Sequence, residues 1–170
     1  APQRGVVPGA IAAARQSVVR GRALSRAGAP LAGVRAEVVG HPEYGWTYTH
    51  GDGFFDLAVN GGSPLSVELS APDFLQVQRR IDPTTRHFGA IGDVVMIPRD
   101  TKKTRIVPGS AGYQVARGTA ESDADGTREA TVVFAPGTLA DLASPTWTVR
   151  ATERTVGPTG KLAMPAELPP

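Results

Sequence analysis

The feature that most constrains the fold is a series of short stretches in which apolar and polar residues alternate, with turn residues between them about every ten positions. The series runs from Val18 to Ile81, and its clearest member is the stretch LSVELS at residues 65–70. Side chains two residues apart lie on the same face of a β-strand, so alternation predicts strands with one face in a core and one in water. The series therefore predicts a small antiparallel β-sandwich.

Two local signals refine the expected strands. The pair Asp52-Gly53 supplies the positive φ that a hairpin turn requires. The run Val-Val-Met-Ile at residues 94–97 is apolar without a break, which predicts a buried closing strand that Pro98 ends. The strands expected in this part of the chain are residues 19–23, 34–38, 46–49, 55–59, 65–69, 74–81 and 94–97.

Composition shifts divide the chain into four parts. Residues 1–16 hold Gly, Pro and a short Ala run, and we expect an arm laid against the sandwich of residues 17–98. Charged residues crowd residues 99–110, which we expect to be a linker. Residues 111–170 contain three further strand-like stretches, at 113–119, 130–135 and 147–156. Three strands do not easily close a core. We therefore expect either a partial, truncated second β-domain or a segment that packs on the first.

The overall composition excludes several classes of protein. The chain has no cysteine, so disulfides, thiolate metal sites and a cysteine nucleophile are excluded. A net charge of +2 is too small to imply a nucleic-acid partner. No apolar run approaches the ~20 residues of a membrane-spanning helix. Most basic residues are Arg, which favours a bacterial source.

Several motifs in residues 17–98 resemble those of a known β-sandwich family. The pattern is Val19-x-Gly21, Gly28-x-Pro30-Leu31-x-Gly33-Val34, Thr49 and Asp52-Gly53-x-Phe55-x-Leu57. It resembles the carboxypeptidase-regulatory-like, or transthyretin-like, domains. The motifs Tyr44-Gly45-Trp46-Thr47, Asp52-Gly53-Phe54-Phe55-Asp56-Leu57 and Asn60-Gly61-Gly62-Ser63 narrow the resemblance to the corresponding domain of teneurins and of bacterial YD-repeat (RHS-type) proteins.

The resemblance implies an all-β fold: a seven-stranded Greek-key transthyretin-like sandwich. It also implies that residues 111–170 occupy a plug-like position before a propeller and a YD-repeat shell. The family's members are secreted or surface-exposed. The expected function is a non-catalytic structural and interaction module, a rigid spacer and docking element that contacts neighbouring domains of its parent protein. The alternative is a stand-alone adhesin module that binds a carbohydrate or a protein.

No reactive constellation is visible in the sequence. The three histidines, His41, His50 and His87, lie in separate expected loops, so no metal site and no cofactor are expected. The segment from Glu121 to Gly126 is similar to a calcium loop, but Val132 stands where the bidentate Glu would be required. We interpret it as an acidic hairpin loop and leave calcium binding open.

Two other groups of polar residues are explained by their expected places in the fold rather than by catalysis or ligand binding. Asp52 and Asp56 are explained as a turn former and an outward-facing strand residue, and no catalytic residue is expected. The pair Arg79-Arg80 and the basic cluster at residues 99–105 lack the interleaved aromatic side chains of a nucleic-acid site, so we expect solvated edges there.

An aromatic-rich segment is the strongest candidate for an interface. It comprises Tyr44, Trp46, Tyr48 and Phe54. Aromatic side chains anchor protein interfaces and stack on sugar rings. We expect these four residues to pack against the core or a neighbouring domain, with external ligand binding as the alternative.

Overall fold

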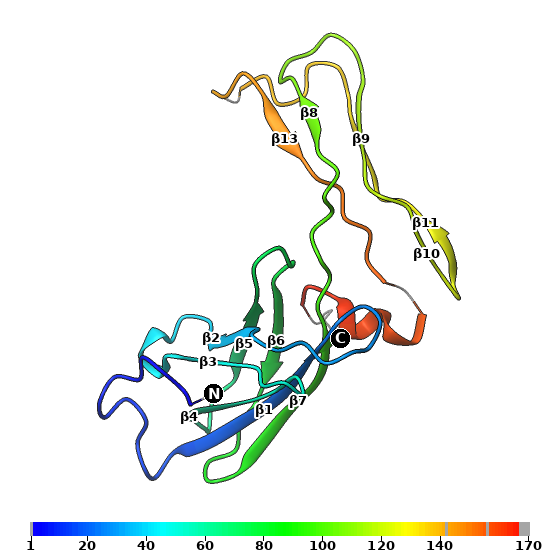
Figure 1. Ribbon diagram of the computed structural model, residues 1–170. Helices are drawn as coiled ribbons and strands as arrows, with labels where there is room; N and C mark the ends of the chain where they lie inside the picture. The colour runs from blue at the N-terminus through cyan, green and yellow to red at the C-terminus, as the bar shows by residue number, and fades with distance from the viewer. Residues whose placement is uncertain (1, 142, 156, 167–170) are drawn as a thin grey trace. The chain divides into compact units, whose positions relative to one another are not determined.

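The computed structural model describes residues 2–141, 143–155 and 157–166 (Figure 1). The chain divides into two compact units, each described here by itself. The first comprises Ala1–Pro98 with Pro158–Pro170, and the second Arg99–Gly157. The final segment is therefore grouped with the first unit. Its described residues contact the sandwich through hydrogen bonds and a small apolar cluster.

Seven strands form the first unit, in two sheets. One sheet has the strand order β3-β2-β5-β6, and the other has the order β4-β1-β7. Strand β1 is antiparallel to β4 and parallel to β7. The strands are β1 (Gln16–Leu24), β2 (Arg35–Val38), β3 (Trp46–Tyr48), β4 (Phe54–Asn60), β5 (Leu65–Ser70), β6 (Val77–Ile81) and β7 (Phe88–Val95). Short 3-10 helices, η1 (Pro42–Tyr44) and η2 (Gly157–Ala163), complete it. The predicted all-β, seven-stranded sandwich is confirmed.

The core lies between the two sheets. In β5, Leu65, Val67 and Leu69 are buried and the residues between them are partly exposed, as the alternation predicts. Phe55 of β4 is fully buried. Its ring lies over Gly21 of β1, where an added β-carbon would lie 2.7 Å from the ring. A large side chain thus fits because its neighbour in the register has none.

The turn at Asp52-Gly53 has the expected positive φ, +80° at Gly53. A β-carbon at Gly53 would lie 2.5 Å from the carbonyl oxygen of Ala23, so close approach also favours glycine. The turn does not form a hairpin within one sheet, because β3 pairs with β2 while β4 pairs with β1. It carries the chain from one sheet to the other.

Two strand boundaries differ from the sequence prediction. Strand β7 starts at Phe88, well before the apolar run, because backbone pairing with β1 recruits residues that have no apolar period. Strand β6 starts at Val77, and Phe74 forms only an isolated bridge with Pro98. The run at residues 94–97 is buried throughout, as predicted.

The end of the described chain packs along β6. The guanidinium of Arg79, which is only 5% exposed, donates hydrogen bonds to the carbonyl oxygens of Leu162 (2.7 Å) and Met164 (3.0 Å). The N–H of Gln78 donates to the carbonyl of Pro165 at 2.8 Å. A small apolar cluster supports these bonds, formed by Leu24, Leu75, Val95, Ile97, Leu162 and Ala163.

The second unit consists of three two-stranded ladders, β8–β13, β9–β12 and β10–β11. Its strands are β8 (Thr104–Ile106), β9 (Gln114–Arg117), β10 (Glu121–Asp123), β11 (Gly126–Arg128), β12 (Thr131–Phe134) and β13 (Trp147–Val149). Strand β8 lies inside the span expected to be a linker. A strand forms here although charged residues are frequent, because exposed and buried positions alternate: Arg105 is exposed and the next residue, Ile106, is buried.

Truncation of Phe55 tests the phase of β4. We expect Phe55→Ala to lower the free energy of unfolding by ~3–5 kcal/mol, because it leaves a cavity at a fully buried site. Phe54→Ala, at the adjacent and partly exposed position, is the matched control and should cost less than ~1 kcal/mol. Urea unfolding monitored by circular dichroism measures both, and equal losses would contradict the assigned faces.

Candidate interaction surfaces

Trp46 and Tyr48 lie on the outer face of the β3-β2-β5-β6 sheet. The residue between them, Thr47, is buried, so the two aromatic side chains point away from the core. In the register with β2, Tyr48 is opposite Arg35 and Trp46 is opposite Glu37. The aromatic residues therefore form part of a mixed face in which charged and aromatic side chains alternate across strands.

The ring of Trp46 is held between other parts of the chain. The guanidinium of Arg35 lies 4.6 Å from the ring centroid, within the range of a cation–π contact. The N-terminal arm pairs with β3 through Arg4, whose N–H donates to the carbonyl of Trp46 at 2.7 Å. Next to it, a β-carbon on Gly5 would overlap the indole ring. The arm thus lies against the side chain that the sequence suggests as an anchor.

The other two aromatic candidates lie elsewhere. Tyr44 is only 6% exposed, and its ring stacks on His41 with centroids 5.1 Å apart. Its hydroxyl accepts a hydrogen bond from the Asn60 amide at 3.1 Å. Phe54 belongs to β4, in the opposite sheet, where the guanidinium of Arg22 lies 5.0 Å from its ring centroid. The structure therefore brings Trp46 and Tyr48 together but not the set of four.

The outer face of the other sheet carries an ion pair. Arg20 and Asp56 are opposite each other in the β1–β4 register and form two hydrogen bonds of 2.8 Å. The hydrogen bond from Arg20 lowers the pKa of Asp56, because it stabilises the ionised carboxylate. The Asp52 carboxylate accepts the N–H of Phe54 at 3.0 Å. Both carboxylates thus have structural partners, an ion pair and a turn, rather than facing each other as an acid/base pair.

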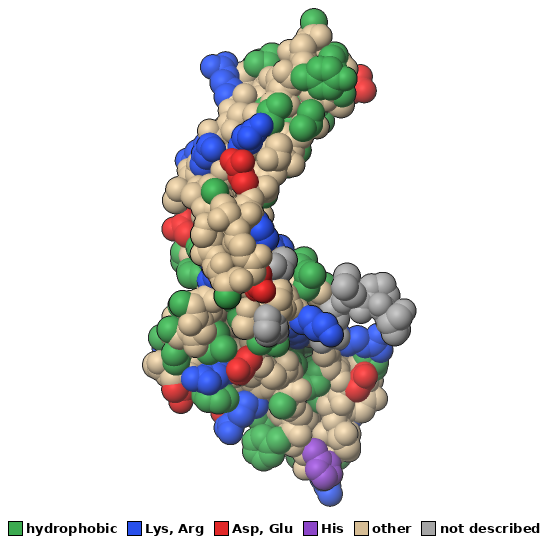
Figure 2. All heavy atoms as spheres, turned by 90° about the vertical axis from the view of Figure 1, so that its right-hand side faces the viewer, with side chains coloured by type: hydrophobic (Ala, Val, Ile, Leu, Met, Phe, Trp, Pro, Cys, Tyr) green, Lys and Arg blue, Asp and Glu red, His purple; other side chains and the backbone are tan. Residues whose placement is uncertain are grey.

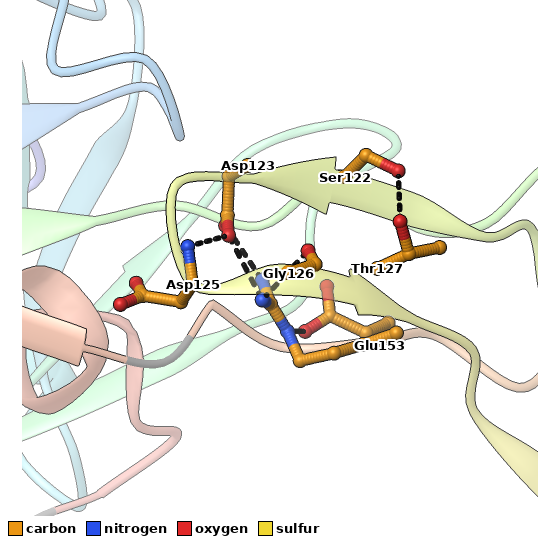
Figure 3. A network of polar contacts seen from close by, with 7 residues as sticks. Ser122, Asp123, Asp125, Gly126, Thr127 and Glu153 are labelled. Carbon is orange, nitrogen blue, oxygen red and sulfur yellow. Dashed lines mark hydrogen bonds and ion pairs between the residues drawn. The ribbon is translucent and has the colours of Figure 1, made fainter.

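The acidic hairpin of the second unit is organised around Arg128, whose partners Asp123 and Glu153 are labelled in Figure 3. Its guanidinium donates to both carboxylate oxygens of Asp123, at 2.9 and 2.6 Å, and to Glu153 at 2.9 Å. These bonds raise the pKa of Arg128. The N–H of Asp125 donates to Asp123 at 2.9 Å, which closes the turn. Both oxygens of the Asp123 carboxylate, which a calcium ion would require as a ligand, thus accept hydrogen bonds from the Arg128 guanidinium. The same guanidinium ties the hairpin to Glu153, whose side chain is 6% exposed.

Neither metal ligation nor a membrane span is evident in the described residues. Within residues 2–141, 143–155 and 157–166, no three His, Asp or Glu side chains gather as metal ligands would. His41 instead forms a 2.9 Å contact with Glu43. No helix in the same ranges is long and apolar enough to cross a bilayer.

A surface that the sequence reading missed lies on the second unit, where apolar side chains are visible in Figure 2. Val133 is 59% exposed and lies opposite Val115, 42% exposed, in the β9–β12 register. The sequence indicates this surface in the run TVVF at residues 131–134, because neighbouring residues of a strand point to opposite faces and one of the two valines must therefore lie outside. Among the described residues of this unit, the exposed large apolar ones are Val107, Tyr113, Val115, Val132, Val133 and Trp147.

Comparison with known proteins gives a consistent result for the sandwich. A family model described as "Teneurin TTR-like domain" matches residues 11–96, just over half of the chain. Teneurin-3 of Danio rerio is 38% identical over 65 residues, which are 38% of this chain and 2% of that protein. Teneurin-1 of Gallus gallus is 34% identical over 93 residues, 54% of this chain and 3% of that protein. The matches thus span a few per cent of these relatives' length.

A solved structure, the Bacillus anthracis TIE protein, is similar with a TM-score of 0.43 and 12% identity, over 82% of this chain and 32% of that one. This similarity is too low to add to the comparison.

A methyl group at Gly5 tests the contact between the arm and Trp46. We expect Gly5→Ala to loosen the arm, because the β-carbon overlaps the indole and Gly5 has φ of +70°. Trp46 fluorescence, recorded in a Trp147→Phe background, should shift to longer wavelength as water reaches the ring. Gly9→Ala, whose added β-carbon meets nothing within 4 Å, is the control at a similar φ of +81°. An identical spectrum for both variants would contradict the contact.

The ion pair of Asp56 predicts a dependence of stability on pH. Because its folded pKa is lowered, its contribution is present above the unfolded pKa, ordinarily 3.8, and is lost as the pH falls through the folded pKa. Asp56→Asn should therefore be less stable than the parent at pH 6, and the difference should shrink as the pH falls below 3.8 and through the folded pKa of Asp56. Thermal unfolding across this range is the measurement, and a difference that grows with acid would refute the pairing.

Proposed function

The chain belongs to the family of teneurin TTR-like domains, and we propose that it is a non-catalytic structural and interaction module of a larger secreted or cell-surface protein. In this proposal the sandwich is a rigid spacer and docking element that contacts neighbouring domains of its parent. A bacterial YD-repeat protein, expected from the sequence, is the proposed parent.

The observation that carries the proposal is the contrast between the two units. The sandwich buries a large set of apolar side chains between two sheets, with Phe55, Leu57 and Leu69 fully enclosed. Close packing of this kind makes a stiff body. On its outer face, Arg20 and Asp56 form an ion pair. For the proposed function, this half of the chain therefore supplies a rigid body and an exposed surface rather than a reacting side chain.

The second unit, in contrast to the closely packed sandwich, has a small buried core. Among its described residues the buried apolar side chains are Ile106, Ala116 and Ala151. So small a core supplies little of the apolar burial that stabilises a domain. The exposed Val115–Val133 pair lies on a two-stranded ladder, which is marginal by itself. We propose that residues 111–157 are part of a second β-domain and that further polypeptide of the parent covers this ladder.

The alternative, a stand-alone carbohydrate-binding adhesin module, is less well supported. Stacking on a sugar requires an open aromatic face. Trp46 is contacted by Arg35 and overlaid by the arm at Gly5, so a sugar would have to displace one of them. The geometry therefore favours Trp46 as an anchor for the chain's own arm.

Photo-cross-linking in the full-length parent tests whether further polypeptide covers the β9–β12 ladder. We expect a photoreactive phenylalanine analogue at Val133 to cross-link to a segment of the same polypeptide outside residues 1–170, because the proposed cover contacts this exposed side chain. The matched control is the same analogue at Ser63, an exposed turn residue of the sandwich, which should give no such product. Mass spectrometry of the digest identifies the linked peptides.

Two outcomes would contradict the proposal. Reaction of the Val133 analogue with water alone would mean that nothing covers the ladder. Binding of the isolated chain to a glycan array, lost on Trp46→Ala, would favour the adhesin alternative.

A further inference from the structure

Three of the four sheet edges in the sandwich are covered by other segments of the same chain. At β3, Arg4 and Trp46 exchange two backbone hydrogen bonds of 2.7 and 2.9 Å. At β4, the side-chain amide of Gln3 mimics a strand: it accepts the N–H of Ala58 at 2.7 Å and donates to its carbonyl at 2.9 Å. At β6, Gln78 donates to Pro165. Unpaired strand edges are templates for pairing with other chains, so these covers remove three such templates.

Strand β7 forms the fourth edge, and its first residues are not covered by another described segment. It is the terminal strand of the β4-β1-β7 sheet, and among the described residues no backbone bond joins residues 88–90 to anything on the side away from β1. Phe88 is 76% exposed. Strand β7 has no Lys, Arg or Pro, the residues that commonly protect edges, and Asp93 is its one charge.

The backbone direction identifies which groups are available. The carbonyl of His87 points toward β1, since it accepts the N–H of Val18 at 3.2 Å. Successive residues of a strand point their backbone groups to opposite sides. Phe88 and Ala90 therefore point N–H and C=O to the open edge, while Gly89 between them pairs with β1. A β-bulge follows: the register shifts after Ala90, and Gly92 has φ of +73°. The regular open segment is thus residues 88–90.

We propose that this segment pairs with the same segment of a second copy of the chain, antiparallel and about a two-fold axis at Gly89. Phe88 of each copy then lies opposite Ala90 of the other, and their outward backbone groups form four hydrogen bonds. The side chains are complementary, because a large ring faces a methyl group on the same sheet face. Gly89 meets Gly89 of the second copy at the close, non-hydrogen-bonded position, where neither copy has a side chain to pack. A two-fold interface requires this self-complementarity.

The area of the contact limits its strength. Four hydrogen bonds and two Phe88 side chains make an interface well below the ~1,200 Å² of stable complexes. The bulge at Gly92 prevents the pairing from extending along β7. The dimer is accordingly weak and reversible, and it joins two three-stranded sheets into one continuous sheet of six.

Sedimentation equilibrium of the 170-residue chain tests the association. The weight-average mass should rise from 17.7 kDa toward twice that value as the concentration rises toward the millimolar range. Ala90→Pro removes the outward N–H without breaking a bond to β1, and should raise the dissociation constant about tenfold or more. Phe88→Lys should also do so, by placing a charge on the edge. Phe54→Lys, on the opposite edge strand of the same sheet, is the matched control and should associate like the parent.

Disulfide trapping tests the register, since the chain has no cysteine of its own. An equimolar mixture of Phe88→Cys and Ala90→Cys proteins should cross-link as a heterodimer, because directly opposite residues have Cα atoms ~5.5 Å apart. Homodimers of either variant should be scarce, since two copies of one position are too far apart for a disulfide. A chain that stays monomeric to 1 mM, or random cross-linking equal to that of Phe54→Cys, would overturn the proposal.

Discussion

The packing of Phe55 on Gly21 is the contact on which the sandwich depends. Gly21 lies in β1, the central strand of its sheet, and an added β-carbon there would clash with both Phe55 and Ile91. The missing side chain leaves room for the Phe55 ring, which is fully buried in the core between the two sheets. Gly21 and Phe55 thus pack as a complementary pair, and the other buried residues of the two sheets complete the core around Phe55.

The rest of the first unit closes the sandwich with its own chain. The N-terminal arm reaches both β3 and β4, through Arg4 and Gln3, and the final described segment is held to β6 by Arg79. These covers use backbone and amide hydrogen bonds, which satisfy edge groups without adding a large core. A closely packed sandwich with three covered edges is suited to separate and position its neighbours, which is the role proposed for it.

Where local patterns dominate, the sequence was sufficient to predict the fold. The alternation of Leu65, Val67 and Leu69, and the apolar run that ends at Ile97, were assigned to the correct faces. The start of β7 was not predicted, since Gly89, Ala90 and Gly92 lack an apolar period and become a strand only by pairing with β1. The alternation of apolar and polar residues indicates which side chains are buried. Pairing between strands that are far apart in sequence produces no such local pattern.

The candidate interface was less predictable for the same reason. The sequence grouped Tyr44, Trp46, Tyr48 and Phe54 because they are close along the chain. Their faces depend on which sheet each strand joins, and the cover of Trp46 comes from Gly5, far away in sequence. The exposed Val115–Val133 pair was missed because a strand with apolar residues on both faces resembles a buried one until its neighbours are known.

Native-state hydrogen exchange measures directly whether the first unit has a complete core and the second does not. We expect amides of the central strands β1 and β5 to exchange last, through global unfolding of the sandwich. Amides of β9 and β12 should exchange at least ~100-fold faster in the same sample, by local opening of a ladder with few buried contacts. Equal protection of both units, lost at one denaturant concentration, would show a single cooperative core and contradict the account.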